Sequence, residues 1–175
     1  LVAWMFFQLY QLLEALLTQA VPLLSGGDWL DLHCDQVGLQ RKAATKANGY
    51  VRFFRSAQTP ESQNVPIPAG RIVRTLPDGK GEVYRYVTLE DAVVHAGQTF
   101  VDVLAESEAY GAETNAGAGQ ICELVTPVSG IDRVDNVTGW LADEAASDES
   151  DEQLRIRYMY AWLSRAGVTS AAYQA

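Results

Sequence analysis

Residues 132–157 read DRVDNVTGWLADEAASDESDEQLRIR, and this stretch contains the change from strand to helix that decides the fold. Its first part alternates apolar and polar side chains as strands do and is closed by Gly139. Its last part begins a helix at Ser150, because Ser150 and Gln153 have the spacing of a capping box, in which each side chain binds a free backbone N–H of the other residue. The acidic, small residues 140–149 predict a linker between the two. We therefore expect a β domain that leads into an outgoing helix.

Acidic residues support the start of this helix. Asp151 and Glu152 place negative charge at the positive end of the helix dipole. Asp151 also lies four residues before Arg155, a spacing that favours an ion pair on one face of a helix.

Composition limits the possible functions. The 175 residues are 48% hydrophobic, enough for one domain or for a compact core with helical appendages. The net charge of -9 disfavours a protein that binds nucleic acid, because phosphate contact needs clustered Lys and Arg. The same charge disfavours binding to an anionic membrane surface.

The two cysteines, Cys34 and Cys122, lie far apart and have no metal-ligand spacing. We expect both to be reduced, with no disulfide, no zinc and no cofactor, as is usual in a reducing cytoplasm. The chain begins at Leu1 rather than Met, and residue 175 lies inside sequence with helical character. We therefore expect a fragment that is cut at both ends.

Residues 1–17 form the most apolar segment, with apolar side chains at helical spacing and a narrow polar stripe. Polar residues interrupt it too often for a membrane span, and it lacks the basic start of a signal peptide. Two interpretations are open: a core helix, which is the commoner case, or a helix that contacts another subunit. The candidate interface residues are Phe6, Leu9, Tyr10, Leu13, Leu16 and Leu17.

A second helix is expected from Asp28, which can cap its N-terminus. Gly38 fits the left-handed position after its last turn, and Leu39 supplies the apolar contact that often follows. The Ala-rich residues 41–47 predict a further helical segment, stopped at Asn48-Gly49. Adjacent helical side chains point in different directions, so the run His33-Cys34-Asp35 is a poor metal site.

From Tyr50 the period changes to two, which predicts strands joined by Gly- and Pro-containing turns. The prolines of residues 65–70 disfavour a place in a central ladder. The glycine-rich residues 111–119 match neither a P-loop nor a dinucleotide fingerprint and predict a flexible connection. The expected strands cover residues 50–55, 72–76, 83–88, 99–108, 120–126 and 131–138.

Two groups of acidic residues have features of a catalytic or calcium site. Glu106 and Glu108 lie two apart on a predicted strand, so their side chains share one face about 7 Å apart, a separation that some glycosidases use. Two acids on the solvent face of a strand are nevertheless common without catalysis. The acidic residues 143–152 could offer oxygens to calcium but lack the alternation and the central Gly of a calcium loop. We predict no enzymatic activity, no catalytic residue and no metal site.

An ordered series of residues from Leu30 onward resembles the baseplate J-like proteins of contractile-tail phages and related prophages. The series includes the turn Ile67-Pro68-Ala69-Gly70 and ends in Asp-Glu-Ser-Asp-Glu followed by Leu, Arg and Arg. Two features depart from the family pattern: Glu113-Thr114 precedes Asn115 where the family usually has glycine, and Gly139 lacks a second glycine. The residues that carry the resemblance as structural signature are Gly70, Asn115, Asn136, Asp148, Glu149, Ser150, Asp151, Glu152, Arg155 and Arg157.

The resemblance implies a structural wedge protein of a phage or prophage tail baseplate. Several copies would surround the end of the tail tube and join the tube and spike hub to peripheral baseplate and fibre proteins. Its partners would be other copies of itself and other tail proteins, with no nucleic acid and no membrane insertion. It would assemble in the host cytoplasm and then belong to the virion. Two alternatives stay open: a glycan-binding or glycan-cleaving tail module, and a baseplate part of a phage-like injection system.

The expected fold class is α+β, with N-terminal helices, a mainly antiparallel β domain and a C-terminal helix. The expected divisions are a helical lead-in over residues 1–48, the β domain over 49–139, the acidic linker over 140–149 and the start of a helical region over 150–175.

Overall fold

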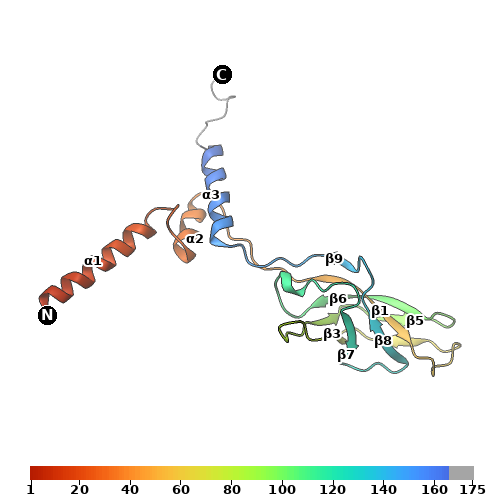
Figure 1. Cartoon of the computed structure of the whole chain (residues 1–175). Coiled ribbons are helices and arrows are strands. Elements are labelled where there is room, and N and C mark those ends of the chain that lie inside the picture. The colour runs from red at the N-terminus through yellow and green to blue at the C-terminus, as the bar shows by residue number, and fades with distance from the viewer. Residues whose placement is uncertain (166–175) are drawn as a thin grey trace, which may run out of the picture. The chain divides into compact units, whose positions relative to one another are not determined.

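The computed structural model describes residues 1–165, which fall into two compact units (Figure 1). The helical unit joins Leu1–Ala43 to the segment that starts at Glu149, and the β unit is Ala44–Asp148. The helical unit contains α1 (Val2–Gln19), α2 (Gly27–Gln36) and α3 (Asp151–Arg165). The predicted α+β class, with helices before and after a mainly antiparallel β body, is confirmed.

The β unit is a strongly curved antiparallel sheet with a small second sheet beside it. In the large sheet the strand order is β7-β3-β4-β6-β1-β8, and β9 also pairs with β1. The end strands β7 and β8 lie next to each other, so the sheet nearly closes into a barrel. Strands β2 and β5 form the second sheet, which agrees with the predicted exclusion of Pro66 from a central ladder. The strands are β1 (Asn48–Arg55), β2 (Val65–Ile67), β3 (Ile72–Thr75), β4 (Arg85–Thr88), β5 (Ala92–Val94), β6 (Phe100–Ser107), β7 (Ile121–Leu124), β8 (Ile131–Asp135) and β9 (Leu141–Asp143).

Alternation along the strands builds the barrel core. Val51 on β1 faces Val103 on β6 across the antiparallel ladder, and both are fully buried. Tyr86 and Trp140 complete the core with an edge-to-face contact at 5.5 Å between ring centroids. Val51 and Val103 follow the period of two that the sequence predicted for residues 50–55 and 99–108.

The predicted helix over residues 41–47 is wrong, because this segment is extended. Its backbone is used elsewhere: the Thr45 N–H donates to the Ala146 carbonyl at 2.8 Å. Gly49 does not stop a helix but lies within β1. A Cβ atom at Gly49 would meet the Trp140 carbonyl oxygen at 2.3 Å, so the position needs glycine for close approach.

In the helical unit, α2 ends as predicted. Gly38 has a φ of 67°, its N–H donates to the Asp35 carbonyl, and the Leu39 N–H donates to the Cys34 carbonyl. This is the Schellman pattern, with Leu39 packed against a small core of Leu30, Cys34 and Leu154. The predicted N-cap is wrong by two residues, because the cap is Gly26 and Asp28 lies in the first turn.

The start of α3 also follows the prediction. The Gln153 N–H donates to the Ser150 hydroxyl at 3.3 Å, and the Ser150 N–H donates to the Gln153 side-chain oxygen at 3.2 Å. This reciprocal pair is the predicted capping box. The helix is described as far as residue 165, so the last ten residues of the predicted helical region lie outside the described part.

Candidate functional site

The acidic signature residue Glu149 is a buried acceptor in the helical unit. Its side chain is 6% exposed. One carboxylate oxygen accepts the backbone N–H of Lys42 at 3.0 Å and also a guanidinium N–H of Arg157. Burial raises the pKa of Glu149, but the bonds from Arg157 and Lys42 outweigh it and hold the pKa below its ordinary value. Glu149 therefore acts as a charged structural group.

Arg41 connects two carboxylates and one backbone carbonyl in the same unit. Its guanidinium donates to the carboxylates of Asp31 and Asp151, each at 2.7 Å, and to the Glu149 carbonyl at 2.7 Å. The hydrogen bonds that Arg41 donates to Asp31 and, to a smaller extent, to Asp151 raise the pKa of Arg41. The predicted pair of Asp151 with Arg155 is therefore replaced by a pair with Arg41, a partner far away in sequence that local spacing could not reveal.

Asp151 and Arg155 both bind the start of α2. The second oxygen of Asp151 accepts the Gly27 N–H at 2.9 Å, and Arg155 donates to the Ser25 carbonyl at 2.8 Å. Asp151 thus serves two helices, since it lies in the first turn of α3 and also accepts a free N–H at the start of α2.

In the β unit the first signature acid, Asp148, also binds backbone. Its carboxylate accepts the Ala44 N–H at 2.8 Å. A neighbouring hydroxyl does the same, since Ser147 accepts the Ala112 N–H at 3.1 Å. Within the acidic residues 143–152, the carboxylates of Asp148, Glu149 and Asp151 thus bind backbone N–H groups or arginines.

The two signature asparagines position the glycine-rich loop. Asn115 forms two bonds of 2.8 Å with the backbone of Ala145, donating to its carbonyl and accepting its N–H. Asn136 is fully buried; it accepts the Ile121 N–H at 2.9 Å and donates to the Gly117 carbonyl at 2.8 Å. Each amide bridges two chain segments as a ladder residue would.

Core aromatic residues bind the same loop. The Tyr86 hydroxyl donates to the Thr114 carbonyl at 2.6 Å, and the Trp140 ring N–H donates to the Ala116 carbonyl at 2.8 Å. Thr114 and Ala116 are buried, so the loop is packed. The prediction of a flexible connection is therefore wrong. The residues that hold the loop, Tyr86 and Trp140, lie far from it in the sequence, so the local pattern could not reveal them.

Glu106 on β6 and Glu108, which directly follows this strand, each lie next to a basic side chain. Lys46 binds Glu106 at 2.7 Å and also lies over the Tyr110 ring. Glu108 lies 3.4 Å from the Arg85 guanidinium. Both carboxylates therefore face a cation of the same unit, the usual arrangement of a structural strand surface.

A pocket of about 450 Å³ bears on the glycan alternative, because Tyr84, Asp78 and Glu113 line it. Asp78, however, closes a turn by accepting the Lys80 and Glu82 N–H groups at 2.8 and 2.9 Å. These bonds lower the pKa of Asp78, which suits a permanent anion rather than a general acid. Asp78 therefore does not support the glycan-cleaving alternative.

The candidate interface helix α1 is exposed along its length. No side chain of α1, which lies wholly within the described residues, is buried. The six candidate side chains range from 46% exposed at Leu16 to 69% at Tyr10. In this structure α1 is therefore not a buried core helix. Within residues 1–165, no helix is long and apolar enough to cross a membrane.

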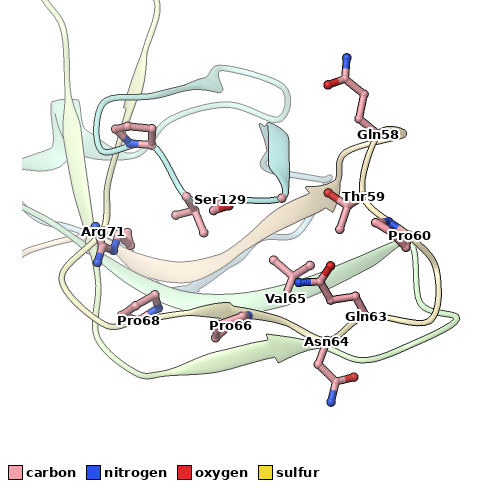
Figure 2. A pocket seen from close by; sticks show the side chains of 13 residues that line it. Gln58, Thr59, Pro60, Gln63, Asn64, Val65, Pro66, Pro68, Arg71 and Ser129 are labelled. Atoms are coloured by element: carbon pink, nitrogen blue, oxygen red, sulfur yellow. The ribbon is translucent and has the colours of Figure 1, made fainter.

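Sequence reasoning missed Arg55, which positions a loop through backbone carbonyls alone. Its guanidinium donates to the carbonyl oxygens of Gln98, Pro60, Gln63, Val94 and His95 at 2.7–3.1 Å. The loop after β1 thereby forms one wall of a groove of about 530 Å³ (Figure 2). An arginine that ends a predicted strand carries no sequence signal for this role.

Comparisons with known proteins agree with this fold. A family model described as the Baseplate J-like protein barrel domain matches residues 50–142. Protein gp29 of Haemophilus phage HP1, provisionally named a baseplate protein, is 30% identical over 130 residues, which are 74% of this chain and 32% of gp29. The Mu-like prophage FluMu protein gp47 of Haemophilus influenzae is 28% identical over 148 residues, which are 85% of this chain and 38% of gp47. The chain thus spans about a third of the length of these relatives.

A solved structure shares the fold. The six-fold symmetrised cryo-EM structure of the anti-feeding prophage baseplate contains a chain similar to this one with a TM-score of 0.53 and 11% identity. The likeness covers 70% of this chain and 39% of that chain. The family match covers more than half of the residues and confirms the resemblance drawn from the ordered signature. The chain belongs to the Baseplate J-like family.

Proposed function

We propose that this chain is the barrel and adjoining helical part of a structural baseplate protein of a contractile tail. The protein would act as a wedge component that joins the tail tube and spike hub to peripheral baseplate and fibre proteins. The observation that carries the proposal is the family match over the barrel, residues 50–142. The relative gp29 and the anti-feeding prophage chain both come from baseplate settings, which supports the same place for this chain.

Contacts between subunits are the second part of the proposal. A wedge protein works by holding and exchanging contacts with its neighbours, and α1 offers an apolar surface on which a neighbouring helix could pack. The six candidate side chains would lie at this contact with another copy or with another baseplate protein. Exposed apolar area of this extent usually marks an interface.

The third part is that the role is mechanical rather than enzymatic. The signature carboxylates of Asp148, Glu149 and Asp151 accept backbone N–H groups or arginine bonds, which supports a role in stabilising the units instead of facing a substrate. The buried amides of Asn115 and Asn136 likewise hold backbone. We assign the signature residues this structural role.

The place in the particle can be tested by electron microscopy. Antibodies raised against the purified chain would be applied to tail particles from the organism that encodes it and detected with gold. The expected result is label at the distal end of the tail, on extended and contracted particles alike. Label along the tube or sheath, or label confined to host material without tails, would contradict a baseplate position.

A further inference from the structure

The groove next to Arg55 lies in the β unit and has fixed walls (Figure 2). The loop after β1 forms one wall through the carbonyl bonds of Arg55, and β2 forms the floor. The opposite wall is the turn before β8, where the Ser56 N–H donates to the Gly130 carbonyl at 2.9 Å. Gly130 has a φ of 87°, and a Cβ there would come within 3.1 Å of Val65. The groove is therefore built by close backbone contacts.

Arg71 gives the groove its charge. Among the described residues that line it, Arg71 is the only charged side chain. The Arg71 Nε is buried, and within residues 1–165 it has no hydrogen-bond partner. The buried Nε itself is out of reach of a ligand, but the Arg71 side chain lines the groove and forms no hydrogen bond or ion pair within residues 1–165. A ligand that offers an acceptor to the rest of the guanidinium would therefore add a charge-assisted hydrogen bond. A carboxylate suits this position best, because it can bind a guanidinium with two parallel bonds.

The turn before β3 fixes where Arg71 lies. Gly70 has a φ of 78° and its N–H donates to the Thr88 carbonyl at 2.8 Å. The Arg71 N–H donates to the Thr88 hydroxyl at 2.9 Å, and the Thr88 N–H returns a bond to the Arg71 carbonyl. Both backbone groups of Arg71 are thus occupied, which anchors its Cα at one end of the groove. The signature residue Gly70 thus provides the positive φ that this turn requires.

The rest of the lining favours a peptide over a sugar. Four prolines and the side-chain amides of Gln58 and Gln63 line the groove, with Arg71 at one end and Gln58 at the other (Figure 2). Amides can bind the N–H and carbonyl groups of an extended backbone, and rigid prolines give an apolar surface at little entropic cost. The described lining contains no aromatic side chain, whereas sugar sites commonly use an aromatic face.

We propose that this groove binds an extended peptide segment of another protein and that Arg71 pairs with an acidic side chain of that segment. The volume of about 530 Å³ lies in the range of peptide and small-molecule sites. The positive charge matches an acidic partner, although the chain as a whole carries a net charge of -9. The groove involves no residue of α1, so this inference is independent of the contact proposed for that helix.

The test uses the full chain and two blocked hexapeptides that differ at one atom group. The first is acetyl-Ala-Ala-Glu-Ala-Ala-Ala-amide, and the second has Gln in place of Glu. Amide chemical shifts are followed by NMR as each peptide is added to the unmodified chain, to Arg71→Gln and to Arg74→Gln. Arg74 undergoes the same chemical change three residues away, where it pairs with Glu123 outside the groove. Sodium glucuronate is a further probe, because it carries a carboxylate on a sugar.

The expected result is a saturable shift of the groove amides with the Glu peptide, unchanged in Arg74→Gln. Binding should weaken about tenfold or more with the Gln peptide and in Arg71→Gln. If Arg71→Gln does not fold, the comparison of the two peptides on the unmodified chain still decides. Equal binding of the two peptides, or shifts that do not saturate, would overturn the proposal. Tighter binding of glucuronate than of the Glu peptide would also overturn it and indicate a sugar-acid site.

Discussion

At the scale of single residues, neighbouring acids of the signature bind different hydrogen-bond donors. Glu149 binds the Lys42 N–H and Arg157, while Asp151 binds the Gly27 N–H and Arg41. A hydrogen bond to a charged group is stronger than a neutral one, and losing one partner leaves the other unsatisfied. Glu149 and Asp151 thus each stabilise the helical unit through their own hydrogen bonds.

Removing the cap of α3 should loosen that helix. Ser150→Ala deletes the oxygen that accepts the Gln153 N–H, and a lost cap costs about 1 kcal/mol. The expected result is faster hydrogen exchange over residues 151–162 with an unchanged β unit. Ser164→Ala is the matched control, because its hydroxyl binds the Ala161 carbonyl within the same helix. Equal exchange in the two variants, with no loss in thermal melts, would remove the capping argument.

Acid should weaken the helical unit. The pKa of Glu149 lies below its ordinary value for the reasons given, and the Gly27 N–H followed by Arg41 lowers the pKa of Asp151. A carboxyl with a lowered folded-state pKa stabilises the fold above its unfolded pKa and loses this contribution as pH falls through the folded value. The loss therefore begins as pH falls below 4.5 for Glu149 and below 3.8 for Asp151.

The measurement is urea unfolding followed at the amide signal of Leu154, from above pH 4.5 to below pH 3.8. Asp151→Asn should lower the midpoint at high pH and reduce its dependence on acid, since one titrating group is gone. Glu152→Gln, which changes an exposed acid at the next residue, should keep the full dependence. An acid dependence unaffected by Asp151→Asn would contradict the structural role of this carboxylate.

At the scale of elements, β1 approaches the segment before β9 closely at Gly49. Gly49→Ala would place a Cβ at 2.3 Å from the Trp140 carbonyl oxygen. This oxygen belongs to the backbone, so relieving the clash requires a shift of the main chain. Overpacking of this kind costs about 1–3 kcal/mol. Gly79→Ala has nothing within 4 Å of the new atom and should change stability by less than about 0.5 kcal/mol. Urea unfolding of the two variants checks the difference; a Gly49→Ala chain as stable as Gly79→Ala would contradict the packing described for β1.

The sequence predicted those elements that depend on residues close to one another in the chain. The capping box of Ser150, the Schellman end at Gly38 and the alternation of β1 and β6 depend on neighbours a few residues away. The extended segment over residues 41–47 was missed because its pairing partners lie about a hundred residues later. Alanine-rich sequence favours helix only where no such pairing competes.

The interactions that matter for the candidate sites were harder to predict. Arg41 and Arg55 bind groups from separate stretches of chain, and Asn115 and Asn136 act across the loop. The signature residues could be named from the family resemblance, but their partners required the fold. Arg71 follows a Gly turn that the resemblance identified, yet its unpaired Nε appears only when burial is known.

At the scale of the whole molecule, the two units have separate cores and different kinds of free surface. The barrel core includes Phe53, Tyr86 and Trp140, while the described part of the helical unit has a small core of Leu30, Cys34 and Leu154. In the helical unit, α1 adds nothing to that core and exposes its apolar side chains. A baseplate subunit of this kind would depend on its neighbours to cover α1.

The apolar face of α1 should therefore control association. Leu13→Glu together with Leu17→Glu places two charges on that face, and burying unpaired charge at an interface is costly. The expected product is a folded monomer. The matched control is Gln8→Glu with Gln11→Glu, which adds two charges on the polar stripe of the same helix and should leave association unchanged.

The most direct measurement is light scattering over a range of protein concentrations, with circular dichroism on the same samples. The account predicts that the unmodified chain and the polar-stripe variant associate, while the Leu13 and Leu17 variant is monomeric with the same helix and strand signal. An unmodified chain that stays monomeric at high concentration would contradict assembly through α1. So would a Leu13 and Leu17 variant that unfolds or aggregates, because it would show that α1 is needed within its own subunit.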